Sequence, residues 1–449
     1  MSITQASRGY ALFVTIPFVG HVNPLLAQAE ELVRRGWRVA IATHTEARRH
    51  VEGRVPGVAH LDLGPLPPEV PSIEAFEAAA SEAPDALRSM DAIFAWHIKI
   101  WPSMYDGLTP AIQRDRPDVM VVDLSAPAGI DAAATAGVPY LANNPDLLTL
   151  LAPTVLPPED GVPLPLLNRS ARDLGFRDRV LNRLHRTVVP HLLSLTIWRR
   201  LNAARATRGL APVDWNARMK HRPILVNGAF GLEYPRTLPP NVHMVGPMIT
   251  GAPEALPPDY DAWLRDGPPV AYVNLGTVAR PKPEHVTKLA EALRSDAFRA
   301  LWVLRKPAQG LLPGPVPPNV RVEAWVPDPR AILAHPNVRV FVSHCGINSV
   351  HEALAAGTPV VGLPFLADQQ DMGLRVQDAG VGLLLDTRRF TAAALREAIV
   401  RVIRDPRFRQ RIPAIQAGFR LAGGPPRAAD LIEAYAAHGD LLFTRAGQV

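Results

Sequence analysis

The feature that most constrains this chain is a regular alternation of strand and helix patterns, which occurs in two separate blocks. In the first block, an apolar run at 10–16 precedes a helical pattern that ends near Arg35, and a second apolar run follows at 37–43. The same order recurs at 119–122 and 126–136. Alternation of this kind is typical of βαβ units, which build a parallel sheet with helices on both faces.

The first helix is expected to begin at Asn23, because asparagine is a favourable N-cap and Pro24 suits the first helical position. Gly36 fits the left-handed residue that often ends a helix. This start leaves His21 in the turn between the first strand and the first helix.

The second block follows a polar, proline-rich segment and repeats the pattern. Strand patterns occur at 270–275, 300–305, 320–325, 339–342 and 360–363, and helical patterns at 284–293, 348–355, 369–378 and 392–404. We therefore predict an N-terminal Rossmann-like domain at 1–234, a linker at 235–269, a C-terminal Rossmann-like domain at 270–430, and a tail at 431–449 that can return to the N-terminal domain. Parallel sheets bind ligands at the carboxyl ends of their strands, so the expected site is the cleft between the two domains.

Composition removes several classes of protein. The 48 Lys and Arg against 42 Asp and Glu give a net charge of only +6 over 449 residues, which argues against a nucleic-acid partner. A single cysteine excludes a disulfide framework. No run reaches the roughly 18 apolar residues of a membrane span, and the first apolar run is not followed by a signal-peptide cleavage site. We expect a cytoplasmic protein without integral membrane association.

Several catalytic motifs are absent. The sequence has no Walker A loop, no G-x-G-x-x-G after the first strand and no G-x-S-x-G elbow. His351 and Glu352 open like the zinc motif H-E-x-x-H, but Ala355 occupies the second ligand position. Asp259 and Asp261 resemble a metal-holding D-x-D pair, yet they lie in the linker with no strand before them. We expect neither a metal nor a cofactor.

The densest functional signal runs from Trp325 to Gln369. A strand there brings His344 and Gly346 to its carboxyl end, and a helix is expected to begin near Asn348. Glycine permits close backbone approach, and a helix N-terminus offers free N–H groups to an anion. This arrangement suits a diphosphate held without metal, and Trp325 offers a flat face on which a base can stack.

A purely structural interpretation of the same residues stays open. Ser349 and Glu352 have the spacing of a capping box, in which the glutamate satisfies the start of its own helix. A lone tryptophan such as Trp325 can equally be a core residue.

The run from Trp325 to Gln369 resembles the donor-binding signature of the family 1 glycosyltransferases, the UDP-glycosyltransferases of the GT-B fold. Its core H-C-G-x-N-S-x-x-E is the plant-like form, whereas many bacterial macrolide glycosyltransferases carry glycine where Cys345 stands. The segment P-F-V-G-H-V-N-P at 17–24 is similar to the family's P-x-x-G-H-x-x-P, and N-L-G-T at 274–277 resembles its S-x-G-S/T loop. The resemblance implies two Rossmann-like, doubly wound α/β domains that face each other across a cleft.

The resemblance also implies a donor role for individual residues. It places Trp325 and Val326 at the uracil, Glu352 at the ribose, and Asp368 and Gln369 at the sugar. The residues implied at the diphosphate are Thr277, His344, Gly346, Asn348 and Ser349. Two positions depart from the plant signature, because Asp328 replaces a glutamine and Met372 replaces the usual asparagine.

His21 and Asp123 are the candidate catalytic residues. A histidine with an ordinary pKa near 6.5 can accept a proton from an acceptor hydroxyl at neutral pH. Asp123 ends the strand at 119–122, and the resemblance implies an aspartate there that orients the histidine and stabilises its cation. The structural alternatives are a histidine bonded to backbone in a glycine turn and an aspartate that caps the helix after Pro127.

The resemblance implies an inverting, metal-independent glycosyltransferase that moves a sugar from a nucleotide sugar, foremost glucose from UDP-glucose, to a hydroxyl of a lipophilic small molecule. Polyketides, macrolides, phenols and carotenoid or lipid alcohols remain open as acceptors. The alternatives are an auxiliary protein of the same fold without turnover and a nucleotide-sugar epimerase. We expect a monomer or a homodimer.

The acceptor side of the cleft is expected in the variable N-terminal segments, where aromatic and apolar side chains can form adaptable walls. The candidates are Phe94, Trp96, Trp101, Met104, Tyr105 and Leu147. Each can equally belong to the local core. The apolar run at 187–193 is interpreted as part of a helix on the acceptor side, with loose membrane contact as the alternative.

Overall fold

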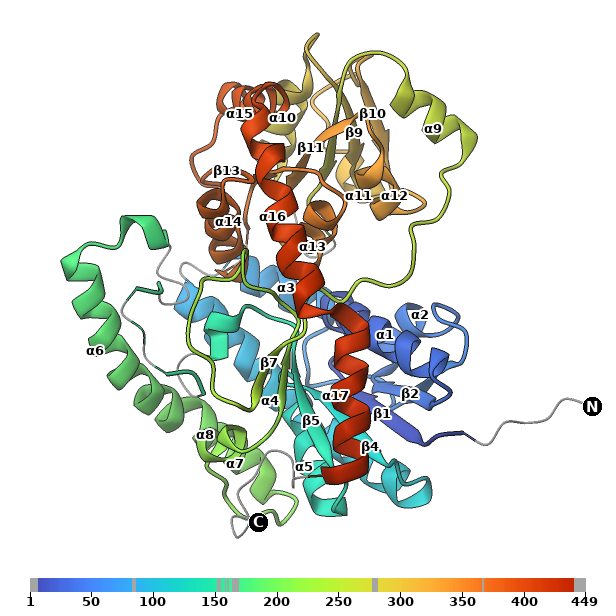
Figure 1. The fold of residues 1–449 in the computed structure, drawn as a ribbon, viewed down its shortest axis with the longest axis vertical. Coiled ribbons are helices and arrows are strands. Elements are labelled where there is room, and N and C mark those ends of the chain that lie inside the picture. The colour runs from blue at the N-terminus through green and yellow to red at the C-terminus, as the bar shows by residue number, and fades with distance from the viewer. Residues whose placement is uncertain are drawn as a thin grey trace, which may run out of the picture.

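The computed structural model describes residues 7–82, 86–151, 155–157, 159, 161–163, 169–276, 282–365 and 367–439. Figure 1 shows two lobes, each with a parallel sheet and helices packed against it. The first sheet has seven strands in the order β3-β2-β1-β4-β5-β6-β7, and the second has six in the order β10-β9-β8-β11-β12-β13. The predicted α/β fold of two Rossmann-like domains is therefore confirmed.

The strands of the two sheets are short. Those of the first sheet are β1 (Tyr10–Val14), β2 (Arg38–Thr43), β3 (Val58–Asp62), β4 (Val119–Asp123), β5 (Tyr140–Asn144), β6 (Ile224–Val226) and β7 (Val242–Met244). Those of the second are β8 (Val270–Asn274), β9 (Arg299–Val303), β10 (Val320–Glu323), β11 (Val338–Ser343), β12 (Val360–Gly362) and β13 (Gly382–Leu384).

Helices connect these strands and cover the sheets. The first lobe contains α1 (Val19–Arg34), α2 (Arg48–Val51), α3 (Ile73–Glu82), α4 (Ala86–Arg114), α5 (Pro127–Ala136), α6 (Phe176–Leu193), α7 (Arg199–Ala206) and α8 (Trp215–Lys220). The later helices are α9 (Pro258–Arg265), α10 (Pro283–Leu293), α11 (Lys306–Gln309), α12 (Pro329–Ala334), α13 (Ile347–Ala355), α14 (Ala367–Ala379), α15 (Ala392–Arg404), α16 (Pro406–Ala422) and α17 (Gly424–His438). None of the helices within the described ranges is both long and apolar enough to cross a membrane.

Strand register brings the carboxyl ends of distant segments together. Strands β1 and β4 pair in parallel with Val14 opposite Val122, so the loops that follow them leave the sheet side by side. In the second sheet, β8 and β11 pair with Asn274 opposite Ser343. The predicted site residues therefore follow neighbouring strands in both lobes.

The predicted start of the first helix is wrong. Helix α1 begins at Val19, so His21 lies in its first turn and Pro24 lies inside the helix. Proline has no N–H to donate to the carbonyl four residues earlier, which here is the carbonyl of Gly20. A proline this close to a helix start disturbs only one bond, so the sequence pattern alone could not exclude the longer helix.

The predicted linker contains regular structure. Strand β7 lies inside 235–269 and pairs with β6, so the first sheet extends beyond residue 234, and α9 lies in the same segment. At the other end of the chain, α16 and α17 run from the second lobe onto the first (Figure 1). Helix α17 packs on α1, where Arg35 binds Asp430 and Glu433, each at 2.7 Å.

Candidate functional site

A histidine–aspartate pair lies at the carboxyl edge of the first sheet. His21 Nδ1 is 2.8 Å from Asp123 Oδ2, and the Asp123 side chain is fully buried while that of His21 is 19% exposed. The same carboxylate accepts a hydrogen bond from the Thr15 hydroxyl at 2.7 Å and one from the Ser125 N–H at 2.9 Å. These bonds fix the carboxylate and leave Nε2 of the imidazole as the nitrogen without a contact to Asp123.

Both structural alternatives for this pair are wrong. His21 uses a carboxylate rather than backbone as its partner. Helix α5 is capped at Ala126 without any side-chain bond, so Asp123 is not its cap.

The local charges favour the cationic imidazole. Burial lowers the pKa of His21, but the charge and hydrogen bond of Asp123, with smaller effects of Asp146 and Asp368, outweigh it and raise the pKa to about 9. The same pairing lowers the pKa of Asp123 although burial opposes this. The pair can therefore hold a proton firmly and stabilise a positive charge on the histidine.

A hydrogen bond next to this pair reaches the opposite lobe. Asn348 Nδ2, at the start of α13, donates a hydrogen bond to the Gly20 carbonyl at 2.9 Å. The Gly20 carbonyl is the one that Pro24 cannot bond within α1. The internal proline thus frees an acceptor for the other domain, and His21 is held directly beside the start of α13.

His344 lies between two glycine loops after β8 and β11. A Cβ added to Gly276 would stand 2.5 Å from the ring of His344, and one added to Gly346 would stand 2.4 Å from it. The ring is buried, its Nδ1 has no hydrogen-bond partner among the described residues, and burial lowers its pKa to about 4. At neutral pH His344 is uncharged, so it can offer an N–H to an anion but no positive charge.

Cys345 has a positive φ of 64°, which is costly for any residue other than glycine. Its Sγ fits beside Gly362 and Gly373, where an added Cβ would meet it at 2.5 and 3.4 Å. This sharp turn from β11 into α13 presents His344 and Gly346 to the cleft, and it explains why glycine is a natural residue at the same position.

The capping-box interpretation of Ser349 and Glu352 is wrong. Helix α13 is capped by Gly346 without a side-chain bond, which places Ser349 inside the first turn. The Glu352 carboxylate has no hydrogen bond or ion pair to any residue that the structure describes. Burial raises its pKa to about 7, against the charge of Arg330, which lowers it, and with a smaller contribution from Asp328.

Asp328 is committed to local structure. It caps α12 by accepting the Arg330 N–H at 2.8 Å, and it accepts the Glu254 N–H at 2.9 Å. Asp328, which stands where the plant signature has glutamine, is therefore engaged in hydrogen bonds within the protein.

Trp325 stands out after β10 because it is 69% exposed. The neighbouring Val326 is buried in the second-lobe core. An exposed indole beside an anchored residue is a free stacking surface, and the structure does not place Trp325 in the core.

The remaining donor candidates differ in how far they are engaged. Gln369 is buried and its Oε1 accepts the Phe365 N–H at 2.9 Å. Asp368 is partly exposed, and burial together with the charge of Asp146 raises its pKa to about 6. Thr277 lies outside the described residues.

Sequence reasoning missed two residues beside His21. Asp146 follows β5 and interacts electrostatically with His21, Asp123 and Asp368. It could have been found, because it follows a strand end at the same sheet edge as Asp123. His97 on α4 is buried and interacts electrostatically with His21, and burial with that charge lowers its pKa to about 3. No sequence signal distinguishes it.

The acceptor candidates separate into two groups. Trp96 is a buried core residue, 2% exposed, whose ring centroid lies 5.1 Å from that of Phe18 and 5.2 Å from that of Phe76. Phe18 in turn lies 6.4 Å from the His21 ring, and Phe94 is partly exposed next to His97.

Four further candidates are core residues like Trp96, which corrects the expectation of acceptor contacts for all five. They are Trp101, Met104, Tyr105 and Leu147. The Trp101 indole donates to the buried Asp131 at 3.0 Å and stacks on Tyr105, on the side of α4 that faces α5. Leu147 packs with the second-lobe core. An apolar sequence pattern on α4 cannot tell its two faces apart.

The two aspartates of the D-x-D pair in the predicted linker form ion pairs with arginines. Asp259 binds Arg321 at 3.0 Å and Asp261 binds Arg265. No cluster of His, Cys, Asp and Glu that could hold a metal is found within the described ranges.

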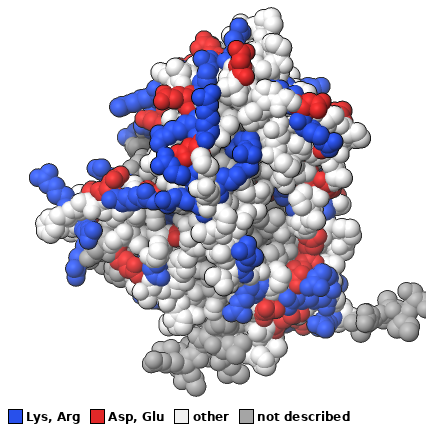
Figure 2. Space-filling view, turned by 45° about the horizontal axis from the view of Figure 1, so that its top comes forward, with Lys and Arg blue, Asp and Glu red and all other residues white. Residues whose placement is uncertain are grey.

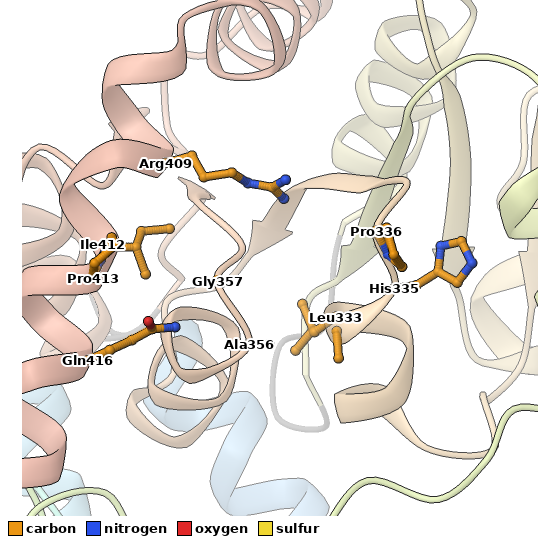
Figure 3. Close-up of a pocket in the computed structure, with 10 residues that line it drawn as sticks. Leu333, His335, Pro336, Ala356, Gly357, Arg409, Ile412, Pro413 and Gln416 are labelled. Carbon is orange, nitrogen blue, oxygen red and sulfur yellow. The ribbon is translucent and has the colours of Figure 1, made fainter.

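A cavity of about 230 Å³ lies away from this site. Figure 3 shows Arg409, Ile412 and Gln416 of α16 on one side of it, and Leu333 and His335 on the other. Its lining precedes β11 and β12, so it is at the amino edge of the second sheet, opposite the loops that carry His344.

Comparison with known proteins agrees with this geometry. The family model described as UDP-glucoronosyl and UDP-glucosyl transferase matches residues 106–417. UDP-glycosyltransferase 1 of Phaeomoniella chlamydospora is 30% identical over 74% of this chain and 71% of that protein. The 4'-demethylrebeccamycin synthase of Lentzea aerocolonigenes is 31% identical over 94% of this chain and 98% of that protein.

Solved structures show the same fold. A calicheamicin glycosyltransferase is 22% identical with a TM-score of 0.66, covering 97% of this chain and 100% of that one. A UDP-glucose: anthocyanidin 3-O-glucosyltransferase in complex with UDP is 19% identical with a TM-score of 0.67, covering 96% and 99%. The chain therefore belongs to the family of UDP-glucoronosyl and UDP-glucosyl transferases, and it is a UDP-sugar-dependent glycosyltransferase of the GT-B fold.

Proposed function

We propose that this enzyme transfers glucose from UDP-glucose to a hydroxyl of a lipophilic natural product, with inversion at the anomeric carbon and without a metal. The observation that carries the proposal is the His21–Asp123 pair, which lies beside the start of α13 through the bond between Asn348 and Gly20. A general base, His21, then lies next to a helix N-terminus that can bind an anion.

The proposed reaction begins at His21. With Nδ1–H donating to Asp123, Nε2 carries the free lone pair and accepts the proton of the acceptor hydroxyl. The acceptor oxygen attacks the anomeric carbon as the bond from that carbon to the diphosphate oxygen breaks. UDP leaves with the bonding electrons, and an α-linked donor gives a β-linked product.

The leaving diphosphate is proposed to bind at the N-terminus of α13. The unpaired N–H groups of the first helical turn supply hydrogen bonds and the positive end of the helix dipole. His344 can add a neutral N–H from its position between the glycine loops. Such groups stabilise the charge that develops on the leaving oxygen without a cation.

The nucleoside is proposed to stack on Trp325 and to bond through its ribose to Glu352. The carboxyl of Glu352 has no partner among the described residues and titrates near neutrality, so it can accept or donate to the ribose hydroxyls. A ribose with both hydroxyls satisfies it better than a deoxyribose does. Asp368 is proposed to meet the sugar.

The acceptor is proposed to be a polyketide, macrolide or phenolic natural product that lies against the partly exposed Phe18 and Phe76. The names of two similar proteins, a rebeccamycin-related synthase and a calicheamicin glycosyltransferase, support this class of acceptor. We propose that the enzyme acts in the cytoplasm.

The test is a screen of UDP-glucose against hydroxylated aromatic and macrolide aglycones, with UDP release and product mass as readouts. Transfer that resists EDTA and yields a β-linked O-glucoside supports the proposal. If no acceptor class leads to release of UDP, the chain is an auxiliary protein. Conversion of UDP-glucose without any acceptor would indicate an epimerase. A strict requirement for Mg²⁺ or Mn²⁺ would contradict metal-free transfer.

A further inference from the structure

Helix α6 and the π-helical segment that follows it, Ser194–Trp198, carry an unusual apolar surface. Eleven large apolar side chains are exposed in the described part of the chain, and seven of them lie here, with exposed fractions from 45% to 82%. These seven are Phe176, Val180, Leu181, Leu184, Val188, Leu192 and Leu195. We call them the α6 stripe.

The spacing of the α6 stripe places it on one side of the helix. Phe176, Val180, Leu184, Val188 and Leu192 follow each other at intervals of four, so they lie on one side of the helix. Away from the stripe, Asn182 is buried and its Nδ2 donates to the Val162 carbonyl at 3.1 Å. Figure 1 shows α6 at the outer edge of the first lobe, away from the sheet. The helix is thus anchored on one side, and no residue that the structure describes covers its apolar side.

Positive charge accompanies the α6 stripe. Residues 176–200 contain six arginines and one acidic residue, Asp178. Arg177 and Arg179 are exposed. In Figure 2 the projecting left edge, where α6 lies in Figure 1, shows uncharged surface bordered by Lys and Arg side chains, with some Asp and Glu side chains nearby. Two copies joined symmetrically through this face would bring like charges together, which argues against self-association.

We propose that α6 is a docking surface for an anionic lipid bilayer. The α6 stripe enters the boundary between headgroups and acyl chains, and the flanking arginines bind lipid phosphates, as in amphipathic helices that lie in a membrane surface. The helix does not cross the bilayer. This inference concerns where the enzyme resides and does not depend on the proposed donor or mechanism.

Vesicle co-sedimentation of the full chain tests the proposal. Wild type is expected to bind vesicles of phosphatidylcholine mixed with phosphatidylglycerol, to bind pure phosphatidylcholine much less, and to be released by salt. The Leu184→Glu/Leu192→Glu variant is expected to lose about tenfold or more in partitioning, and Arg177→Glu/Arg179→Glu a similar amount. The matched control is Leu421→Glu, which places the same charge on an 89% exposed leucine of α16 and is expected to bind like wild type.

Folding of each variant is checked by thermal unfolding and by UDP binding, and α6 takes no part in UDP binding in this account. If the leucine variant fails to fold, the arginine variant still decides the question. Equal partitioning of wild type and the arginine variant would overturn the proposal. So would a wild-type dimer that ignores vesicles and becomes a monomer when Leu184 and Leu192 are replaced, because the α6 stripe would then join two copies of this chain.

Discussion

The two sides of the cleft are assembled from the chain in different ways. The donor side takes its candidates from one stretch, Trp325 to Gln369, together with the loop at Gly276. The side around His21 combines Asp123, Asp146 and His97, which come from separate elements. A contiguous site can be recognised as a motif, whereas a dispersed site becomes visible only when the sheet order brings its parts together.

The largest expected effect falls on the dispersed side. We expect His21→Ala to lower kcat by about 10²–10⁴, the usual contribution of a general base. UDP affinity should stay within a few-fold, because His21 lies on the opposite lobe from the nucleotide candidates. Initial rates of UDP release and titration calorimetry with UDP measure the two effects. Near wild-type turnover by this variant would rule out His21 as the base.

The next effect concerns the donor side. Gly346→Ala places a Cβ 2.4 Å from the His344 ring, so the ring or the loop must move. We expect UDP affinity to fall by about tenfold or more, because the His344 ring leaves the position in which it is proposed to meet the diphosphate. Overpacking of this kind should also lower the free energy of unfolding by about 1–3 kcal/mol. The control is Gly314→Ala, where the added Cβ meets nothing within 4 Å. Unchanged UDP binding in Gly346→Ala would separate His344 from the donor site.

The contrast explains what the sequence could predict. The strands at 119–122 and 270–275 were recognisable because buried parallel strands are continuous apolar runs, and the structure has them at β4 and β8. The start of α1 was missed because Pro24 is also common at a first helical position. Trp101 was misassigned because the pattern of α4 does not show which side meets α5.

The donor preference gives a smaller effect. We expect UDP-glucose to exceed dTDP-glucose by about tenfold in kcat/KM, since one lost hydrogen bond to a charged group is worth about 1.5–3 kcal/mol. Glu352→Gln should reduce this ratio and leave the melting temperature nearly unchanged, because Glu352 does not cap α13. A retained ratio in Glu352→Gln would show that the ribose is recognised by another group.

The smallest effect tests the bond between the two sides. We expect Asn348→Ala to lower kcat/KM by up to about tenfold, the value of one hydrogen bond. Pro24→Ala restores an N–H that can bond the Gly20 carbonyl within α1 and so competes with Asn348. We expect it to lower kcat/KM by less than Asn348→Ala does. The double variant should lose no more than Asn348→Ala alone. Additive losses would mean that the two residues act independently.

The pairing of His21 with Asp123 is the central claim, and the pH dependence of kcat/KM tests it most directly. Only the neutral imidazole accepts a proton, so the wild-type rate should rise with pH up to about 9, where His21 titrates. Asp123→Asn removes the charge that favours the cation and leaves burial, which lowers the pKa of His21. We predict that this variant is slower and that its rate reaches a plateau at lower pH. Superimposable pH profiles of wild type and Asp123→Asn would contradict the account.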